Sequence, residues 1–232
     1  MKFDEPLTQG RLIRRYKRFL ADVTLQDGTE VTVHVPNTGS MMSTSRSGSA
    51  VALSYSSNPK RKLPWTLELY GAARGFWVGV NTYRTNRIVE EAIRNRELKE
   101  LAVFDAVRRE VRYGANSRID LMLEQSGARC YVEVKNVTYK SGARALFPDA
   151  VTARGLKHLQ ELVRIVKEGH RGVIFFLVNR ADCESMSPAR EIDPRYADGL
   201  AEAIDRGVEC LAYATCPTVE EITIERQIPF IF

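Results

Sequence analysis

Short runs of alternating hydrophobic and polar residues fill the first 80 positions of the chain. The segment ADVTLQDGTEVTVHV (residues 21–35) has the pattern of a β-hairpin, and SAVALSYS, WTLELY and GFWVGV supply further short strands between Gly, Ser and Pro residues. About five strands without a strong helical pattern are typical of a small barrel. We therefore predict an all-β N-terminal domain over residues 1–80.

The register of the first hairpin follows from its apolar residues. We expect residues 27–29 to form a three-residue loop with Gly28 in a left-handed conformation. This loop places three apolar pairs on one face, namely Leu25 with Val31, Val23 with Val33 and Ala21 with Val35. A two-residue turn would pair Val23 with Thr32 and interrupt that face.

The pattern changes from about residue 81. NRIVEEAIRNRELKEL (residues 86–101) predicts a helix, and a second helix is expected over residues 150–168, with Leu156, Leu159, Val163 and Val166 on one stripe. GVIFFLVN is a continuous apolar run, typical of a strand buried on both faces of a sheet. A helix near DPRYADGLAEAIDRG and a strand at VECLAYA complete a strand-helix-strand unit. Residues 81–232 are thus predicted to form an α/β domain.

Composition excludes several classes of protein. Hydrophobic residues make up 44% of the 232 positions, which is enough for a packed core. No run approaches the roughly 18 apolar residues of a membrane span, and MKFDEPLTQG has no signal-peptide core. The four cysteines form no C-x-x-C pair, so we interpret them as reduced thiols. We expect a cytoplasmic protein with no membrane partner.

The net charge of +5 is unevenly placed. Residues 1–80 carry 11 Lys+Arg against 6 Asp+Glu, whereas the remaining residues carry 23 of each sign. The whole positive excess therefore belongs to the predicted barrel. A basic module joined to a neutral one suggests that the basic part holds a polyanion.

SRIDLMLEQSGARCYVEVK (residues 117–135) raises the question of chemistry. If Ser126 and Gly127 form a two-residue turn, Asp120 lies directly opposite Glu133, and Lys135 shares the face of Glu133. The reverse side supports this register with three apolar pairs, which are Ile119 with Val134, Leu121 with Val132 and Leu123 with Cys130.

Two facing carboxylates repel, and the single charge of Lys135 does not balance them. A divalent cation would balance the two carboxylates, and hard oxygen ligands favour Mg²⁺ or Mn²⁺. The alternative interpretation is a solvated hairpin face with an ordinary surface salt bridge.

The arrangement resembles the PD-(D/E)xK nuclease-like motif, although Ile119 stands where the motif has Pro. The ordered segments HVPNTGSM, NTYRTNRIVEEAI, SRIDLMLE, CYVEVKNVT, FPDAVTARGLKHLQEL, VIFF and SPAREID resemble the sugar fermentation stimulation protein A family across essentially the whole chain. The resemblance implies an N-terminal OB-fold barrel, a nuclease-like α/β domain and DNA binding. Asp120 and Glu133 then match the metal-binding acids, and Lys135 matches the lysine that positions water or phosphate.

A further acid is expected from the helix before the hairpin. Glu90 and Glu91 lie equally far from the centre of its apolar stripe, so helix geometry does not separate them. The NRxxxEA pattern of the family favours Glu91 as a third catalytic and metal-binding residue. If the protein is an enzyme, the chemistry is phosphodiester hydrolysis, with metal-bound water as nucleophile and Lys135 as a cationic clamp.

Two clusters combine cations with aromatic rings, a combination that holds phosphates while stacking on unpaired bases. They contain Arg14, Arg15, Tyr16, Lys17 and Arg18 in RRYKRF, and Lys60, Arg61, Lys62 and Trp65 in NPKRKLPW. Arg154 and His158 lie one turn apart on a later helix and are further candidates for phosphate contact. The alternatives are a charged edge strand, an exposed loop and a solvated helix face.

These features support two functions. The first is a DNA-binding protein of low sequence specificity with a Mg²⁺-dependent nuclease-like site. The second is a non-catalytic DNA-binding regulator of sugar (maltose-type) metabolism genes on the same scaffold. Single-stranded DNA and RNA remain possible partners in both. A metabolic enzyme has little support, because the chain has no Gly-rich phosphate loop, no G-x-S-x-G and only three scattered histidines.

Overall fold

The N-terminal strands close into a barrel. The computed structural model describes residues 1–113 and 117–232. Its barrel strands are β1 (Thr8–Tyr16), β2 (Leu20–Leu25), β3 (Glu30–His34), β4 (Ala50–Tyr55), β5 (Trp65–Gly71) and β6 (Trp77–Gly79). They run in the order β3-β2-β1-β4-β5-β6, and a parallel pairing of His34 with Thr66 joins β3 to β5. Five strands are thus closed around a core that includes Leu12, Val23, Val33, Leu53 and Leu67.

The first hairpin has the predicted type of loop but a different register. Val23 pairs with Val31 and Ala21 with Val33, two positions away from the predicted partners. Leu25 closes the loop by bonding Thr29 O at 2.8 Å, and Gly28 takes the left-handed conformation (φ 87°). The predicted register is wrong because a shift of two residues keeps the same apolar face, so the hydrophobic pattern does not distinguish the two pairings.

The α/β domain is built on a six-stranded mixed sheet of order β15-β14-β12-β9-β8-β7. Its strands are β7 (Ala106–Tyr113), β8 (Ser117–Gln125), β9 (Ala128–Val137), β12 (Arg171–Val178), β14 (Glu209–Pro217) and β15 (Ile222–Gln227). A small sheet contains β10 (Lys140–Ser141), β11 (Arg144–Phe147) and β13 (Ser185–Pro188). The helices are α1 (Thr85–Arg94), α2 (Ala153–Lys167) and α3 (Pro194–Asp205), with short 3-10 turns η1 (Ala73–Gly75), η2 (Thr82–Arg84) and η3 (Lys99–Leu101).

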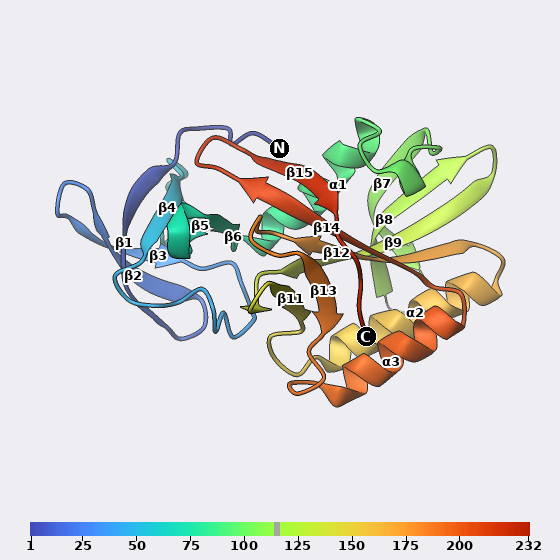
Figure 1. The fold of residues 1–232 in the computed structure, drawn as a ribbon. Helices are drawn as coiled ribbons and strands as arrows, with labels where there is room; N and C mark the ends of the chain where they lie inside the picture. The colour runs from blue at the N-terminus through green and yellow to red at the C-terminus, as the bar shows by residue number, and fades with distance from the viewer. Residues whose placement is uncertain (114–116) are drawn as a thin grey trace.

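Helices cover both faces of the large sheet. Figure 1 shows α2 and α3 side by side along one face, while α1 lies on the other. The central strand β12 is therefore buried on both sides, as its uninterrupted apolar sequence predicts, and pairs in parallel with β9 and β14. No helix in the described parts of the chain is long and apolar enough to cross a membrane.

Helix α1 is shorter than its sequence pattern predicts. It ends at Arg94, because Arg96 adopts a left-handed conformation (φ 59°). Glu97 N then bonds Ala92 O at 2.9 Å and Arg96 N bonds Ile93 O at 3.0 Å, which together form a Schellman cap. The cap separates α1 from η3, so the predicted helix over residues 86–101 is wrong in its second half.

The two parts of the chain contact each other at several points. Gly79 of β6 donates from its amide to Asn179 O at 2.8 Å, and a Cβ at Gly79 would lie 2.3 Å from the Asn179 side chain. Phe3 N bonds Glu220 O at 3.0 Å, so the N-terminal residues lie against the α/β sheet. The barrel is thereby placed at one end of the sheet, as Figure 1 shows.

A buried ion network lies beside this contact. The Arg180 side chain is buried, bonds Thr138 O at 2.6 Å and pairs with Asp182 at 2.6 Å, while Lys140 pairs with Asp182 at 2.7 Å. Burial opposes ionisation of Asp182, but the hydrogen bonds and charges of Arg180 and Lys140 outweigh it and lower its pKa to about 2. Arg180 depends on this carboxylate for its charge balance.

We expect Asp182→Asn to destabilise the fold by about 3 kcal/mol at pH 7, because it leaves a buried arginine unpaired. A carboxyl with a depressed folded-state pKa contributes stability above its unfolded pKa and loses it as the pH falls. The difference between wild type and variant should therefore stay constant from pH 7 to about 5 and shrink below about pH 4. Urea denaturation at several pH values measures it. A difference that does not change with pH contradicts the assignment.

Candidate functional site

The hairpin that carries the acids forms with the predicted turn. Ser126 and Gly127 make its two-residue turn, both with positive φ (49° and 84°), as a type I′ turn requires. Leu121 pairs with Val132 and Leu123 with Cys130, which confirms the predicted register over this part of the ladder. The hairpin therefore delivers Asp120 and Glu133 to the same end of two paired strands.

The ladder between β8 and β9 stops at Leu121 and Val132, one pair short of the acids. Beyond this point the Asp120 carboxylate bonds the other strand itself, since its Oδ2 accepts from Val134 N at 2.8 Å. Its Oδ1 accepts from Asn86 Nδ2 of α1 at 3.0 Å. Asp120 is thus fixed by a backbone amide and a helix side chain. The predicted pairings of Asp120 with Glu133 and of Ile119 with Val134 are wrong, because the ladder ends before them.

Glu133 is held from the opposite helix layer. It is buried, and its Oε1 contacts both Lys135 Nζ, at 2.5 Å, and His158 Nδ1 of α2. Lys135 Nζ lies 3.4 Å from the same imidazole nitrogen. Lys135 does share a face with Glu133, as predicted, and the structure adds His158 to the pair.

The two carboxyl groups have opposite pKa shifts. Burial, followed by the negative charge of Glu133, raises the pKa of Asp120, and the Val134 amide and Lys135 only partly offset this. Burial also opposes ionisation of Glu133, but the hydrogen bond from His158 and the charge of Lys135 outweigh it and lower the pKa of Glu133. The influence of Glu133 on Asp120 shows that the two acids interact electrostatically although they belong to different contact networks.

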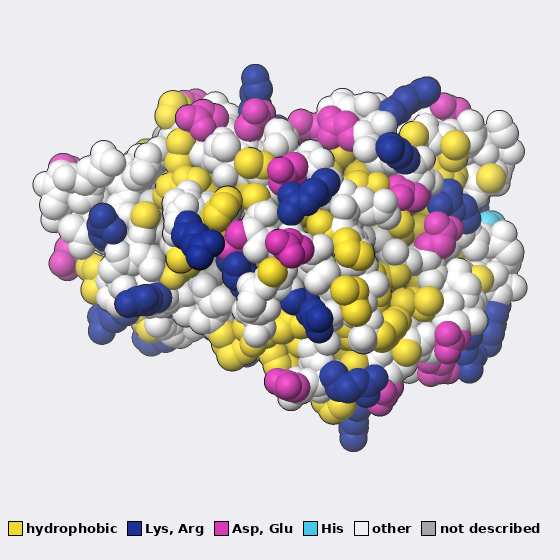
Figure 2. Space-filling view, in the orientation of Figure 1, with side chains coloured by type: hydrophobic (Ala, Val, Ile, Leu, Met, Phe, Trp, Pro, Cys, Tyr) yellow, Lys and Arg dark blue, Asp and Glu magenta, His cyan; other side chains and the backbone are white. Residues whose placement is uncertain are grey.

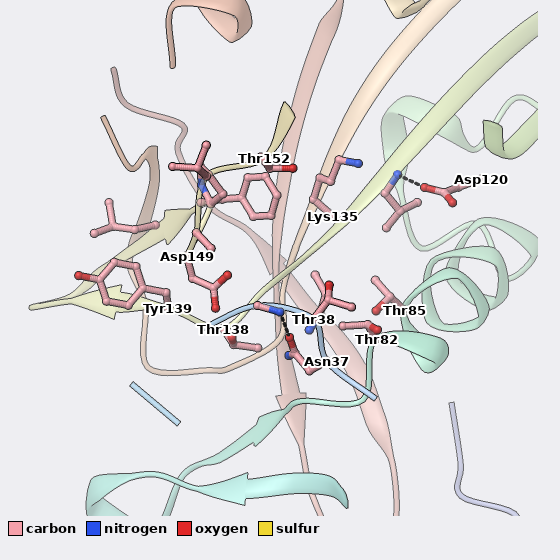
Figure 3. A pocket seen from close by; sticks show the side chains of 18 of the residues that line it. Asn37, Thr38, Thr82, Thr85, Asp120, Lys135, Thr138, Tyr139, Asp149 and Thr152 are labelled. Carbon is pink, nitrogen blue, oxygen red and sulfur yellow. Dashed lines mark hydrogen bonds between the residues drawn. The ribbon is translucent and has the colours of Figure 1, made fainter. Parts of the chain in front are cut away.

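A cavity of about 360 Å³ opens beside Asp120 and Lys135 (Figure 3). Its lining is mostly polar and comes from the barrel, from the η2–α1 turn and from the α/β domain. It includes Asn37, Thr38 and Gly39 of the PNTG segment, Thr82, Thr85 and Asn86, and Thr138, Tyr139, Asp149 and Thr152. The buried Thr85 hydroxyl at this cavity has no hydrogen-bond partner within the described chain. Hydroxyl, amide and ammonium donors therefore converge on one space next to a carboxylate.

The PNTG loop is positioned by contacts from both domains. Asp149 Oδ2 accepts from Met41 N at 2.9 Å, and Ser40 Oγ donates to Asp149 O at 2.6 Å. Asn37 Oδ1 accepts from Gly39 N at 2.8 Å, a bond drawn in Figure 3. A Cβ at Gly39 would lie 2.4 Å from Asp149 Oδ1, so only glycine allows this approach.

Sequence reasoning did not assign these loop residues to the site. The segment was recognised only as part of a family pattern, and no spacing along the chain connects Asn37 or Thr38 with Asp120. The glycine in PNTG was the available signal, because an isolated glycine in a polar loop often marks a close approach of backbone to another group.

Glu91, the predicted third acid, lies outside the cavity lining. Its Oε1 is 3.1 Å from the N-terminal amine of Met1, and its side chain is 42% exposed. Glu90 pairs with Arg94 and Arg109, both at 2.8 Å. The α1 residue that contacts Asp120 is Asn86, one turn before Glu90.

The cations of RRYKRF differ in their engagement. Arg14 pairs with Asp22 at 2.9 Å, and Tyr16 donates to the same carboxylate. Arg15 donates to the backbone oxygens of Asn37, Gly39, Ser40 and Arg18, so it supports the PNTG loop. Lys17 and Arg18 are exposed. Of the five predicted residues, these two present the charges most open to a phosphate.

The second predicted cluster lies on an exposed loop before β5. Lys60, Arg61 and Lys62 are exposed, with Arg61 held by a 2.7 Å bond to the Thr66 hydroxyl. Trp65 packs edge-on against Tyr55, with ring centroids 4.8 Å apart. In Figure 2 the Lys and Arg side chains are spread over the barrel at the left rather than gathered in one patch on this face.

Arg154 and His158, predicted as phosphate contacts, form a pair on α2. Arg154 Nε lies 3.3 Å from His158 Nε2, while the other imidazole nitrogen contacts Glu133. His158 therefore contacts Glu133, and neither residue is part of the lining of the cavity beside Asp120. Its contact with Glu133 joins residues 25 positions apart, which the sequence did not indicate.

The chemistry of the donors fits a divalent cation in part. Lys135 and His158 both contact Oε1 of Glu133, which leaves its Oε2 for a cation, and Asp120 supplies two further carboxylate oxygens. Oxygen donors of this kind suit Mg²⁺ or Mn²⁺. Within the described residues, no three His, Cys, Asp or Glu side chains are grouped as a ready-made metal site. A cation here would complete its shell with water or substrate oxygens.

Comparison with known proteins places the chain. Residues 83–221 match the model of the "Sugar fermentation stimulation protein RE domain", and residues 13–80 match the "SfsA N-terminal OB domain". The chain belongs to the sugar fermentation stimulation protein family. The expected architecture, an OB-fold barrel followed by an α/β domain, is confirmed.

Relatives match along the whole chain. A sugar fermentation stimulation protein homolog of Pelobacter propionicus is 57% identical, covering 97% of this chain and 98% of that protein. The homolog of Geobacter sulfurreducens is 54% identical over 100% and 99%. The solved structure of Pyrococcus furiosus SfsA in complex with Ca²⁺ is 25% identical and superposes with a TM-score of 0.91, covering 100% and 98%.

We expect Gly39→Ala to destabilise the protein by about 1–3 kcal/mol, because the added methyl group overlaps the Asp149 carboxylate. Thr38→Ala, at the exposed neighbouring position, should change stability by less than about 0.5 kcal/mol. Chemical denaturation measures both. In an Asp149→Ala background the effect of Gly39→Ala should fall, and strictly additive effects would contradict the close approach.

Proposed function

We propose that this protein hydrolyses phosphodiester bonds of DNA with the help of a divalent cation. One observation carries the proposal: the nuclease-like hairpin directs Asp120 and Lys135 into a cavity that the barrel's PNTG loop also lines. A polyanionic strand held by the basic barrel would reach the acids and the amine through this cavity.

Asp120 and Glu133 are the proposed metal ligands, and Mg²⁺ or Mn²⁺ is the proposed ion. The Ca²⁺ bound by the Pyrococcus furiosus relative supports an oxygen-ligand site in this family. A bound divalent ion supplies Lewis acidity and a water of lowered pKa. Glu91 is left out of the proposed set, because its carboxylate pairs with the Met1 amine.

The chain's own groups have separate roles. Lys135 presents its ammonium to the cavity, where it offsets negative charge on a phosphate and on the attacking oxygen. His158 holds the Glu133 carboxylate in place through Oε1 and is a positioning residue. The unpartnered Thr85 hydroxyl and the exposed Thr38 are donors to phosphate or sugar oxygens.

One observation favours the second function, a non-catalytic DNA-binding regulator. Glu133 already has Lys135 and His158 as partners within the protein, and the described chain offers no three-ligand metal cluster. In that case the acids would contribute to stability alone, and binding would depend on the barrel.

We expect Asp120→Asn to abolish metal-dependent cleavage while changing DNA affinity by less than about threefold. The negative charge of Asp120 is needed to bind the divalent cation, whereas DNA is bound by the cations of the barrel. Cleavage of plasmid and linear DNA with Mg²⁺ or Mn²⁺, together with a binding titration, measures the two effects. Asp105→Asn, at an exposed acid of the same domain, is the matched control. If metal-loaded wild-type protein cleaves no DNA or RNA of any topology, the hydrolytic proposal fails and the non-catalytic DNA-binding regulator is the remaining function.

Replacing Lys17, Arg18, Lys60 and Lys62 with alanine should weaken DNA binding and flatten its salt dependence. Each lost phosphate contact removes about one unit from the slope of log affinity against log salt concentration. Anisotropy titrations at several NaCl concentrations measure the slope. Lys157→Ala on α2, which removes an exposed cation distant from the barrel in sequence, should leave it unchanged. An unchanged slope in the fourfold variant would exclude the barrel as the binding surface.

A further inference from the structure

A second cavity, of about 580 Å³, lies where the barrel meets the start of the α/β domain. Its lining combines barrel residues, among them His34, Arg61, Lys62 and Glu68, with Tyr83 and Arg84 of the η2 turn. None of these residues lines the cavity beside Asp120. The predicted nucleic-acid residues Arg61 and Lys62 are part of it, while its aromatic residues were not predicted.

The floor of this cavity is a fixed and charge-compensated network. Glu68 is buried and accepts from Ser54 Oγ at 2.7 Å and from Asn81 Nδ2 at 2.8 Å. Arg84 pairs with the same carboxylate at 3.1 Å. The negative charge of Glu68 is therefore balanced inside the protein, and it does not repel an anion above it.

One wall is aromatic and open to solvent. Tyr83 is 76% exposed, and its ring centroid lies 6.3 Å from that of His34 with the planes inclined by 35°. The backbone of Tyr83 is anchored, because Asn81 Oδ1 accepts from its amide at 2.9 Å. Burial and the nearby charge of Arg61 lower the pKa of His34, so its ring is neutral at pH 7. A flat ligand can stack on the free Tyr83 face without displacing protein groups.

Two cations also line this cavity. Arg61 and Lys62 are exposed, and the Arg61 guanidinium is tied to the Thr66 hydroxyl, so this charge has a defined position. An exposed aromatic ring and two cations that line one polar cavity match a nucleotide, whose base stacks while its phosphate meets the cations. In duplex DNA the base faces are covered by neighbouring bases, so this site selects unpaired nucleotides.

The η2–α1 turn separates this cavity from the acidic one. Tyr83 and Arg84 line the 580 Å³ cavity, whereas Thr82, Thr85 and Asn86 line the 360 Å³ cavity beside Asp120. Consecutive residues of one short segment thus face two cavities. One of these residues, Asn86, donates to Asp120 at 3.0 Å, so the short segment links the two cavities.

We propose that the Tyr83 cavity binds an unpaired nucleic-acid strand, with the base on Tyr83 and the phosphate on Arg61 and Lys62, and directs it towards Asp120 and Lys135. The delivery step rests on the proposed hydrolytic function, whereas the binding step does not.

The test compares single-stranded and duplex oligonucleotides by fluorescence anisotropy in EDTA, so that no cleavage is needed. Tyr83→Ala should weaken binding of a 12-nucleotide oligothymidylate by about 5- to 150-fold, the effect of losing one base–aromatic stack, and change duplex binding less than twofold. Tyr83→Phe should retain single-strand binding. Phe76→Ala, at another exposed aromatic of the barrel region, is the matched control. A parallel titration with oligouridylate shows whether DNA or RNA is preferred. Weaker binding of either oligonucleotide by Tyr83→Ala supports the site.

Equal losses on single strand and duplex, or no loss, would overturn the proposal. Tyr83 is mostly exposed, so an unchanged melting temperature is expected and confirms that the variant is folded. The two proposals can fail separately. If binding depends on Tyr83 but no cleavage occurs, the nucleotide site is supported and the hydrolytic function is excluded. If the protein cleaves single strands and Tyr83→Ala changes neither binding nor cleavage, the hydrolytic function is supported and the nucleotide site is excluded.

Discussion

The carboxylate of Asp120 replaces a strand partner at the point where β8 and β9 separate. By accepting from Val134 N at 2.8 Å it satisfies a backbone amide that the ladder leaves unpaired, and it does so with a charged group. The two strands can therefore part without an unsatisfied donor. This separation lets Glu133 turn to His158 on α2 while Asp120 meets Asn86 on α1. The rest of the site is arranged around it.

The barrel completes the site rather than merely accompanying it. Its PNTG loop is bound to Asp149 from one side and to Arg15 from the other, so both domains determine the cavity's shape. This explains why Arg15, although it belongs to a segment predicted to bind phosphate, donates to carbonyl oxygens of the PNTG loop. The basic residues thus divide into those that hold the protein together and those, such as Lys17 and Lys62, whose exposed charge is open to a polyanion.

Local pattern was sufficient for much of the fold. The β8–β9 hairpin, with its Ser126–Gly127 turn, was predictable because a one-residue slip would move its apolar side chains to the wrong face. The apolar run of β12 and the strand-helix-strand unit after it were equally clear. The register of the first hairpin was not predictable, since a shift of two residues keeps the same apolar face. The end of α1 was not predictable either, because it depends on the left-handed backbone of Arg96. The resemblance to a family supplied the OB-fold.

By itself, the sequence determined most of the elements, the β8–β9 register as far as Leu121 and Val132, and the presence of Asp120, Glu133 and Lys135 on these two strands. Tertiary structure alone decided what meets them. His158 contacts Glu133 across 25 residues, and the PNTG loop meets Asp149 across more than 100. Such contacts have no periodicity along the chain, because they depend on how helices pack on a sheet and how one domain docks on another. Periodicity records only which face of an element is buried, and never which distant side chain covers it.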